Sequence, residues 1–266
     1  MNGWLAQCAP FLAGGGRIEA TPGGARLVLP AASSARYADA QLDDYAGLPR
    51  RRFPHRPPLR LSLRARFLPE GPHHPSPVTR DTLTGTAGFG FWNNPFGAQS
   101  KLPAPPQAVW FFYASPPSDM PLALGVPGHG WKAACLDAGS ASALVWAPLA
   151  PAVMLACRAP KLYRAVWRRV QRALGICERS LAFEQGDMAD WRAYEIDWRR
   201  DGARWRVDGE TVLETERAPR GPLGFVAWID NQYAIVTPQG KFRFGLLDSP
   251  FEQWLEVAEV EVMSEE

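Results

Sequence analysis

The sequence has little of what marks a metalloprotein, a membrane-spanning protein or a nucleic-acid-binding protein. Its 266 residues include only four cysteines and four histidines, and none of the cysteines has the C-x-x-C spacing of zinc sites. No apolar run reaches the roughly 18 residues that a membrane span needs. The net charge is only +2, whereas a nucleic-acid interface needs a larger basic excess on one face. We therefore expect no metal, no cofactor and no nucleic-acid partner.

The N-terminal segment also lacks the features of a secretion signal. Residues 1–16 have no basic region at their start, and Gln7 and Pro10 interrupt their apolar stretch. Residues 5–8 (LAQC) are only faintly similar to a lipoprotein cleavage site, because Gln7 precedes the cysteine and the site lies too near the start. The sequence predicts reduced thiols and a cytoplasmic location.

What the chain does contain is typical of an all-β domain. Its 26 prolines and 24 glycines are spread along the whole length, as many short strands and turns require. All-β sandwiches run to roughly 200–250 residues as one domain, so we expect a single domain over residues 1–266. The 11 tryptophans fit either a sandwich core or the lining of a concave binding site.

Period-two alternation predicts most of the strands. Residues 59–67 place Leu, Leu, Leu, Ala and Phe on one face, and residues 194–198 place Tyr194, Ile196 and Trp198 on one face. The dipeptides at 201–202 and 208–209 are both Asp-Gly, a strong hairpin signal between alternating strands. Besides these, the predicted strands are 25–29, 87–92, 109–114, 203–207, 210–213, 223–229, 233–237, 241–244 and 254–262.

One helical region interrupts this pattern, at residues 147–180. Leu162, Val166, Val170 and Leu174 recur every four residues and predict an amphipathic helix over 160–174, with a shorter helix over 150–156 before it. Seven basic residues and one acid lie between 158 and 179. The basic face has three interpretations: a solvated surface, a lid over the concave face, or a peripheral contact with anionic lipid.

Several segments resemble glycoside hydrolase family 16, the laminarinase-like enzymes. Residues 191–198 (WRAYEIDW) followed by 204–209 (RWRVDG) are similar to a run that crosses two paired strands in that family. Residues 86–92, 221–231 and 254–262 resemble neighbouring strands, whereas Arg192 stands where the family usually has His or another polar residue. The resemblance implies a concanavalin A-like jelly-roll β-sandwich of two antiparallel sheets, with a sugar cleft on the concave face and here an inserted helical hairpin.

The catalytic strand of the family is where the sequence departs from it. That strand carries E-x-D-x-(x)-E, which supplies a nucleophile and an acid/base, and a retaining glycosidase needs these two carboxyl groups about 5–5.5 Å apart. The corresponding residues here are 107–113 (QAVWFFY), which contain no carboxylate. We therefore expect that the mechanism of the family does not operate on this strand.

The candidate site residues follow from the same comparison with the family. The run 109–113 fits an aromatic cleft floor or a strand buried on both faces. The run 230–233 fits a sugar-binding pair of Asp230 with Trp228 or an ordinary turn, and residues 93–95 fit a loop above the cleft or a turn. The candidate ligand-binding residues are Trp92, Asn94, Gln107, Trp110, Phe112, Trp228, Asp230, Asn231 and Gln232, and Asp230 is also the one candidate for catalysis.

Three functional hypotheses remain open at this point. The first is a binding protein without glycanase activity, whose aromatic cleft takes a glycoside or another partly apolar small molecule. The second is a glycoside hydrolase or other enzyme that uses relocated carboxylates such as Asp230. Two carboxyl groups facing each other at about 5–9 Å would favour the second hypothesis. The third is a peripheral membrane protein that is held by the basic helix.

Overall fold

Two seven-stranded sheets form the protein, and all their strand pairings are antiparallel. The computed structural model describes residues 3–69, 83–95, 104–181 and 188–264. The first sheet has the strand order β1 (Ala9–Ala13), β4 (Asp39–Asp43), β13 (Gly224–Asp230), β6 (Thr86–Trp92), β7 (Gln107–Ala114), β8 (Gly130–Asp137) and β9 (Cys177–Ser180). The second has the order β12 (Glu210–Thr215), β11 (Gly202–Val207), β10 (Arg192–Arg199), β5 (Leu59–Pro69), β16 (Gln253–Ser264), β3 (Gly24–Leu29) and β2 (Arg17–Thr21).

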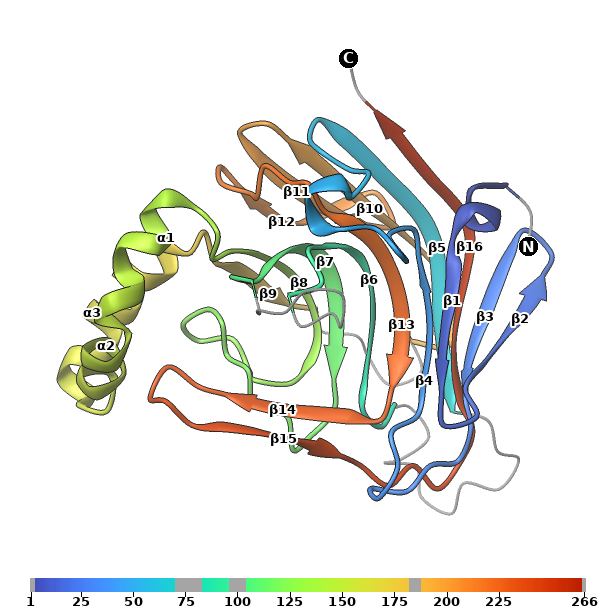
Figure 1. The fold of residues 1–266 in the computed structure, drawn as a ribbon, viewed down its shortest axis with the longest axis horizontal. Helices are drawn as coiled ribbons and strands as arrows, with labels where there is room; N and C mark the ends of the chain where they lie inside the picture. The colour runs from blue at the N-terminus through green and yellow to red at the C-terminus, as the bar shows by residue number, and fades with distance from the viewer. Residues whose placement is uncertain (1–2, 70–82, 96–103, 182–187, 265–266) are drawn as a thin grey trace.

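The core lies between the two sheets, as the alternating sequence predicts (Figure 1). Phe89, Phe111, Trp131 and Tyr194 meet there, with the rings of Phe89 and Phe111 each 5.0 Å from that of Tyr194. Edge-to-face aromatic pairs of this kind stabilise a core beyond the area they bury. The structure is an all-β sandwich of two antiparallel sheets with a helical insertion, which confirms the predicted fold class.

Every strand predicted from alternation overlaps an observed strand, whereas β1, β2, β4, β8 and β9 were not predicted. A separate hairpin of β14 (Gln232–Val236) and β15 (Phe242–Leu246) projects from the end of β13. It extends toward the helices at one side of the molecule (Figure 1).

The helical insertion consists of α1 (Ala141–Trp146), α2 (Ala150–Cys157) and α3 (Pro160–Ala173). It begins before the expected boundary because the Ser140 hydroxyl caps α1 by accepting a hydrogen bond from the Ala143 amide at 3.2 Å. It also ends sooner, since Cys177–Ser180 is not helical but forms β9, paired with β8. Gly175, with φ of +56°, follows α3 in the left-handed conformation that often ends a helix.

Candidate functional site

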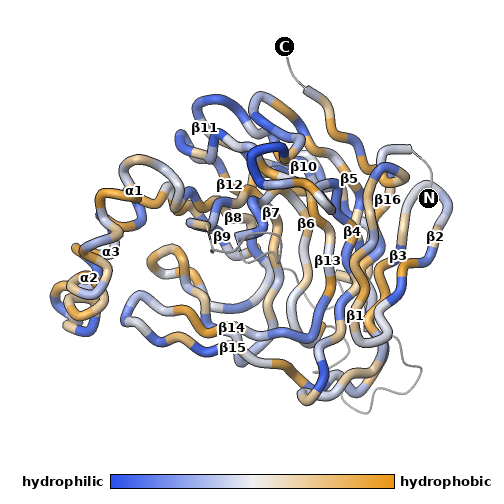
Figure 2. The backbone as a smooth tube through the Cα atoms, viewed as in Figure 1, coloured by the Kyte–Doolittle hydropathy of each residue, from blue (hydrophilic) through white to orange (hydrophobic). Residues whose placement is uncertain are grey.

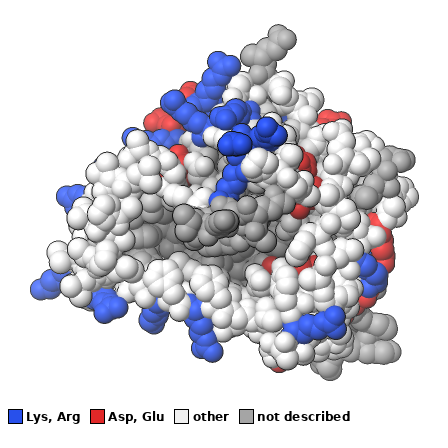
Figure 3. Space-filling model, in the orientation of Figure 1, with Lys and Arg blue, Asp and Glu red and all other residues white. Residues whose placement is uncertain are grey.

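The face of the first sheet that is turned away from the core carries a second cluster of aromatic side chains. Along β13, Phe225 and Ile229 enter the core, whereas Val226 and Trp228 belong to this outer cluster. We call this side the concave face, because the molecule is hollowed between the helices and these strands (Figure 3).

Four rings cover the middle of the concave face, and we call them the aromatic floor: Trp92, Trp110, Phe112 and Trp228. The Trp110 ring lies 5.6 Å from that of Phe112 and 5.5 Å from that of Trp228. Trp92, Trp110 and Phe112 are half-buried, so each keeps part of its ring open to solvent. The strand over residues 109–113 is therefore not buried on both faces: one face lies in the core, and the other is partly exposed.

Glycines on β6 allow the rings of β7 and β13 to meet across that strand. Gly88 stands in register between Trp228 and Phe112, and Gly90 between Val226 and Trp110. A Cβ atom on Gly88 would lie 2.6 Å from Cη2 of Trp228, closer than such atoms can approach. The alternation Gly88-Phe89-Gly90-Phe91 thus places Phe in the core, and the missing side chains of the two glycines allow the neighbouring strands and the Trp228 ring to approach closely.

A row of polar groups borders the aromatic floor at the end of β13. Asp39 of β4, Asp230 of β13 and Thr86 of β6 are in register. The Thr86 hydroxyl donates to Oδ1 of Asp230 at 2.8 Å and accepts from Nε1 of Trp228 at 2.9 Å. The Thr86 hydroxyl therefore links the Asp230 carboxylate to the Trp228 indole.

The two carboxyl groups of this row retain protons more readily than isolated ones do. Burial raises the pKa of Asp230 to about 6, although the Gln232 amide and Thr86 donate hydrogen bonds that oppose this. Burial and then the nearby Asp230 charge raise the pKa of Asp39 well above its ordinary value. Oδ1 of Asp39 is buried without a hydrogen-bond partner among the described residues, while Oδ2 accepts from the Tyr37 hydroxyl at 3.0 Å.

A second polar edge lies further along β4. The Gln41 amide donates to Oδ2 of Asp43 at 2.9 Å, and Nε1 of Trp92 donates to the Tyr45 hydroxyl at 2.6 Å. Burial raises the pKa of Asp43. These side chains place an amide, a carboxyl and a phenol beside the aromatic floor.

The concave face ends at β8 and β9 in a buried ion pair. Nζ of Lys132 lies 2.9 Å from Oε1 of Glu178, and the two side chains are almost completely buried. Lys132 also donates to the Met120 carbonyl, and Glu178 accepts from the Ala123 amide. The pair therefore fixes the loop around 120–123 over this end of the sheet.

The predicted site residues divide into two groups. Trp92, Trp110, Phe112, Trp228 and Asp230 lie together on the concave face. The structure does not bring the other four into this group, as follows.

Gln107 and Asn231 have other partners. Gln107 occupies a core-side position of β7, and its amide donates to Asp137 on β8 at 2.6 Å. Asn231 is completely buried; its Oδ1 accepts from the Ala38 amide, and its Nδ2 donates to the carbonyls of Ser33, Arg36 and Leu247. These contacts use the hydrogen-bonding capacity of the Asn231 amide for holding chain segments together.

Asn94 and Gln232 lie at turns. Asn94 has φ of 42° after β6, and its carbonyl accepts from Arg50 at 2.9 Å. Gln232 is exposed at the start of β14, and its amide donates to Asp230. Both residues therefore lie at turns, as one of the two interpretations predicted: Asn94 directly follows β6, and Gln232 begins the β14–β15 hairpin.

β4, which was not among the predicted strands, also contributes to this site. Asp39 and Asp43 both lie on this strand, beside β13. The signal was present in the alternation Asp39-Ala40-Gln41-Leu42-Asp43, in which Ala40 and Leu42 are buried in the core. Among the described residues, no cluster of His, Cys, Asp and Glu side chains could hold a metal ion.

Comparison with known proteins finds similarity in structure but not in sequence. No protein-family profile matches the chain, and no curated protein matches it. One similar solved structure is an endo-acting O-glycanase of the human gut microbiota, with TM-score 0.48, 10% identity and coverage of 94% of this chain and 83% of that one. A Bacillus licheniformis β-glucanase has TM-score 0.46 and 10% identity, with 97% and 91% of the two chains covered.

A third similar structure is an immunostimulatory antigen and pseudo β-1,3-glucanase of Mycobacterium tuberculosis. Its TM-score is 0.46 at 9% identity, with 91% of this chain and 75% of that chain covered. At such identities the likeness concerns the fold alone. The jelly roll of this chain is similar to that of family 16 glucanases.

Proposed function

We propose that the protein is a carbohydrate-binding protein whose ligand stacks on the aromatic floor. The observation that carries the proposal is the group of half-buried rings of Trp92, Trp110 and Phe112 on an outward sheet face. Such a face is costly to leave in water, and aromatic rings with a few polar groups beside them are typical of ligand sites. The flat C–H faces of a sugar ring fit these rings, and its hydroxyl groups fit Gln41 and Asp43.

The absence of carboxylates on β7 favours binding over hydrolysis by the mechanism of family 16. The four residues of β7 on the concave face are Ala108, Trp110, Phe112 and Ala114. A retaining glycosidase needs a nucleophile and a proton donor about 5–5.5 Å apart. None of these four side chains supplies either group.

A second candidate function is hydrolysis by Asp39 and Asp230. The register favours it, because side chains directly opposite each other on antiparallel strands have Cβ atoms about 4.5–5.5 Å apart, and these residues are such a pair. Asp230, with its pKa raised to about 6, would be the proton donor. Both side chains are nearly inaccessible, at 2% and 6% exposure, which favours the binding protein.

Calorimetric titration with a panel of soluble oligosaccharides tests the proposed function. We expect saturable binding by the wild type and about a tenfold loss of affinity in Trp110→Ala, which corresponds to about 1.4 kcal/mol. Trp191→Ala is the matched control, since Trp191 is a half-buried aromatic that packs against Arg66 of the other sheet. Equal losses in both variants, or no binding to any sugar, would refute a site on the aromatic floor.

The two functions are separated by an assay of reducing-sugar release from the sugars that bind. A binding protein releases no more sugar than a heat-inactivated sample does. Release that disappears in both Asp39→Asn and Asp230→Asn, while binding persists, would instead establish hydrolysis by that pair.

A further inference from the structure

The charged side chains of the helical insertion are all positive. Residues 138–177 contain no Asp or Glu and six basic residues, so the rest of the chain is net acidic. All six are exposed: Arg158, Lys161, Arg164, Arg168, Arg169 and Arg172. None forms an ion pair within the described part of the chain. The segment therefore presents cations without local counterions.

The same segment exposes large apolar side chains. Val145 is 73% exposed and Leu155 is 67% exposed, and Leu144, Leu149 and Leu162 are each more than half exposed. Of the eleven large hydrophobic residues that are exposed in the described chain, these are five. Figure 2 shows the apolar stretch along α1 and α2. Single exposed apolar residues are ordinary, but a group of this kind marks an interaction surface.

The insertion is also fixed to the sandwich. Nε1 of Trp167 donates to the Leu122 carbonyl at 3.0 Å, and Val170 and Ala173 are buried. The tip of the β14–β15 hairpin lies against α2, since Nε of Arg158 donates to the Gln239 carbonyl at 3.2 Å. The insertion that carries the exposed apolar side chains is thus held in place by contacts with the sandwich and with the β14–β15 hairpin.

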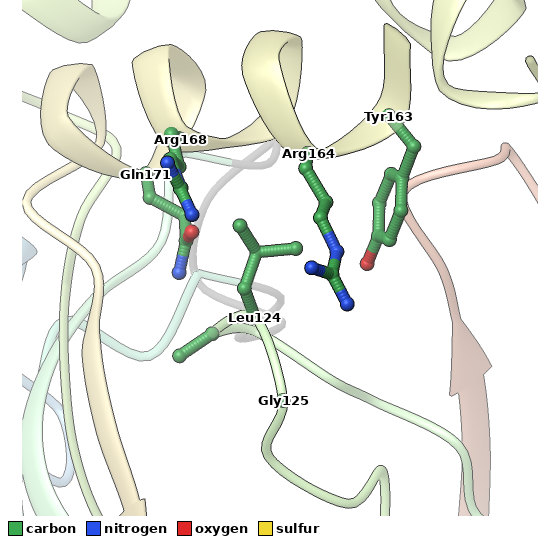
Figure 4. Close-up of a pocket in the computed structure, with 7 residues that line it drawn as sticks. Leu124, Gly125, Tyr163, Arg164, Arg168 and Gln171 are labelled. Carbon is green, nitrogen blue, oxygen red and sulfur yellow. The ribbon is translucent and has the colours of Figure 1, made fainter. Parts of the chain in front are cut away.

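A pocket of about 510 Å³ lies between α3 and the loop at 123–125. Arg164, Arg168 and Gln171 point from α3 toward Leu124, with Tyr163 beside Arg164 (Figure 4). Arginines four residues apart lie on one face of a helix. Two guanidinium groups with a phenol and an amide suit a phosphate group.

The combination of apolar and basic groups determines the occupant. A second copy of the chain would bring the same positive charges against this surface. An acidic protein would form ion pairs with the arginines, but its charged surface would not bury the exposed leucines of α1 and α2. An anionic bilayer surface accepts both, because its headgroups carry phosphate and its acyl boundary takes apolar side chains.

We propose that the protein docks peripherally on anionic phospholipid bilayers through this insertion. Leu144, Val145, Leu149 and Leu155 enter the boundary between headgroups and acyl chains. Arg164 and Arg168 bind lipid phosphate in the pocket, and the other basic residues of α3 face the headgroups. No helix among the described residues is long and apolar enough to cross a membrane, so the contact is with one leaflet.

Co-sedimentation with vesicles tests the proposal. We expect binding to vesicles of phosphatidylcholine and phosphatidylserine at 3:1 and at least tenfold weaker binding to pure phosphatidylcholine. Raising the salt from 0.1 M to 0.5 M should weaken the binding, since exposed charges are screened. Lys161→Glu/Arg164→Glu/Arg168→Glu should lose at least tenfold in partition coefficient. The matched control is Arg36→Glu/Arg51→Glu/Arg200→Glu, which changes three exposed basic residues elsewhere by the same charge.

A second set of variants tests the exposed apolar residues of the insertion. Leu144→Glu/Leu149→Glu/Leu155→Glu should abolish sedimentation with vesicles, and the corresponding triple alanine variant should weaken it at least fivefold. Both should keep the wild-type circular dichroism, because these side chains are exposed, and the alanine variant serves if the glutamates disturb folding. Equal binding to neutral and anionic vesicles, an equal loss in the basic control, or no effect of the alanines would overturn the proposal.

Discussion

Asp39 of β4 and Asp230 of β13 lie directly opposite each other in the register of the first sheet, with both side chains buried. Burial is the main cause of the raised pKa of each residue, and for Asp39 the charge of Asp230 adds to it. Two adjacent carboxylates in a buried site cannot both ionise at low cost. Both carboxyl groups therefore retain a proton to higher pH than isolated ones do.

We predict that this pair makes the folded state less stable as the pH rises. A folded-state pKa of about 6 for Asp230, against about 3.9 in an unfolded chain, favours the protonated form on folding. Its stabilising effect is fully present below about pH 4 and is lost as the pH rises through about 6. The change amounts to roughly 2–3 kcal/mol, at about 1.36 kcal/mol for each unit of pKa.

Urea unfolding between pH 4 and pH 8 measures this effect, with Asp39→Asn/Asp230→Asn as the reference. The neutral amides remove the titration, while the groups that face the pair, Tyr37, Asp43 and Thr86, are unchanged. The stability of the wild type should fall relative to the variant as the pH rises. A constant difference across this range would contradict the raised pKa values.

A second prediction concerns the core that Trp198 helps to form. Trp198 is completely buried on β10, and its Nε1 donates to the Pro219 carbonyl at 2.8 Å. Trp198→Ala should lower the free energy of unfolding by about 3–5 kcal/mol, the range for a truncated core aromatic. Trp198→Phe should lower it less, because most of the ring volume remains. A loss below 1 kcal/mol in the alanine variant, measured by urea melts, would show that this face is not a core.

A third prediction concerns the buried pair of Lys132 and Glu178. Lys132→Met leaves the Glu178 carboxylate in a site where burial already raises its pKa. Breaking such a pair costs about 3–5 kcal/mol. Adding Glu178→Gln to Lys132→Met removes the unpaired charge and should recover most of that loss in chemical denaturation. If the double variant is as unstable as Lys132→Met alone, the charge of Glu178 is not the cause.

The sequence predicted strands well where alternation is long and the turns are Asp-Gly. Tyr194, Ile196 and Trp198 occupy the core as expected. Alternate residues of a strand point to the same face, and the apolar face of this strand packs against the other sheet. The short strands β1 and β2 lie at sheet edges, where fewer side chains are buried and the periodic signal is weak. β9 was assigned to the helical region because four residues carry too little periodicity to separate from a helix end.

The candidate site could be predicted only in part, for a related reason. Trp110, Phe112 and Trp228 were identified because a resemblance placed their strands beside the cleft. Asp39 is distant in sequence from Asp230, and their proximity depends on β4 pairing with β13. The periodicity of a single sequence predicts which residues of a strand share a face, but it does not predict which strand lies beside it. The pairing of Asp39 with Asp230 and the hydrogen-bond partners of Gln107 and Asn231 are therefore visible only in the structure.

The last prediction tests whether Gly88 is required for the aromatic floor. A Cβ atom at this position would lie 2.6 Å from Cη2 of Trp228 and 2.4 Å from the Phe111 carbonyl oxygen. Gly88→Ala must therefore displace the indole or the strand, and overpacking of this kind costs about 1–3 kcal/mol. We expect weaker oligosaccharide binding and a changed near-ultraviolet circular dichroism spectrum.

A double-mutant cycle with Trp228→Ala assigns the cost to its source. If the indole is the main obstacle, Gly88→Ala should destabilise the Trp228→Ala background less than it destabilises the wild type. Neighbouring residues in contact show coupling energies of about 0.5–3 kcal/mol, so urea melts resolve the difference. The same cost in both backgrounds would place the conflict at the Phe111 carbonyl, and Gly88 would then serve the pairing of β6 with β7 rather than the placement of the Trp228 ring.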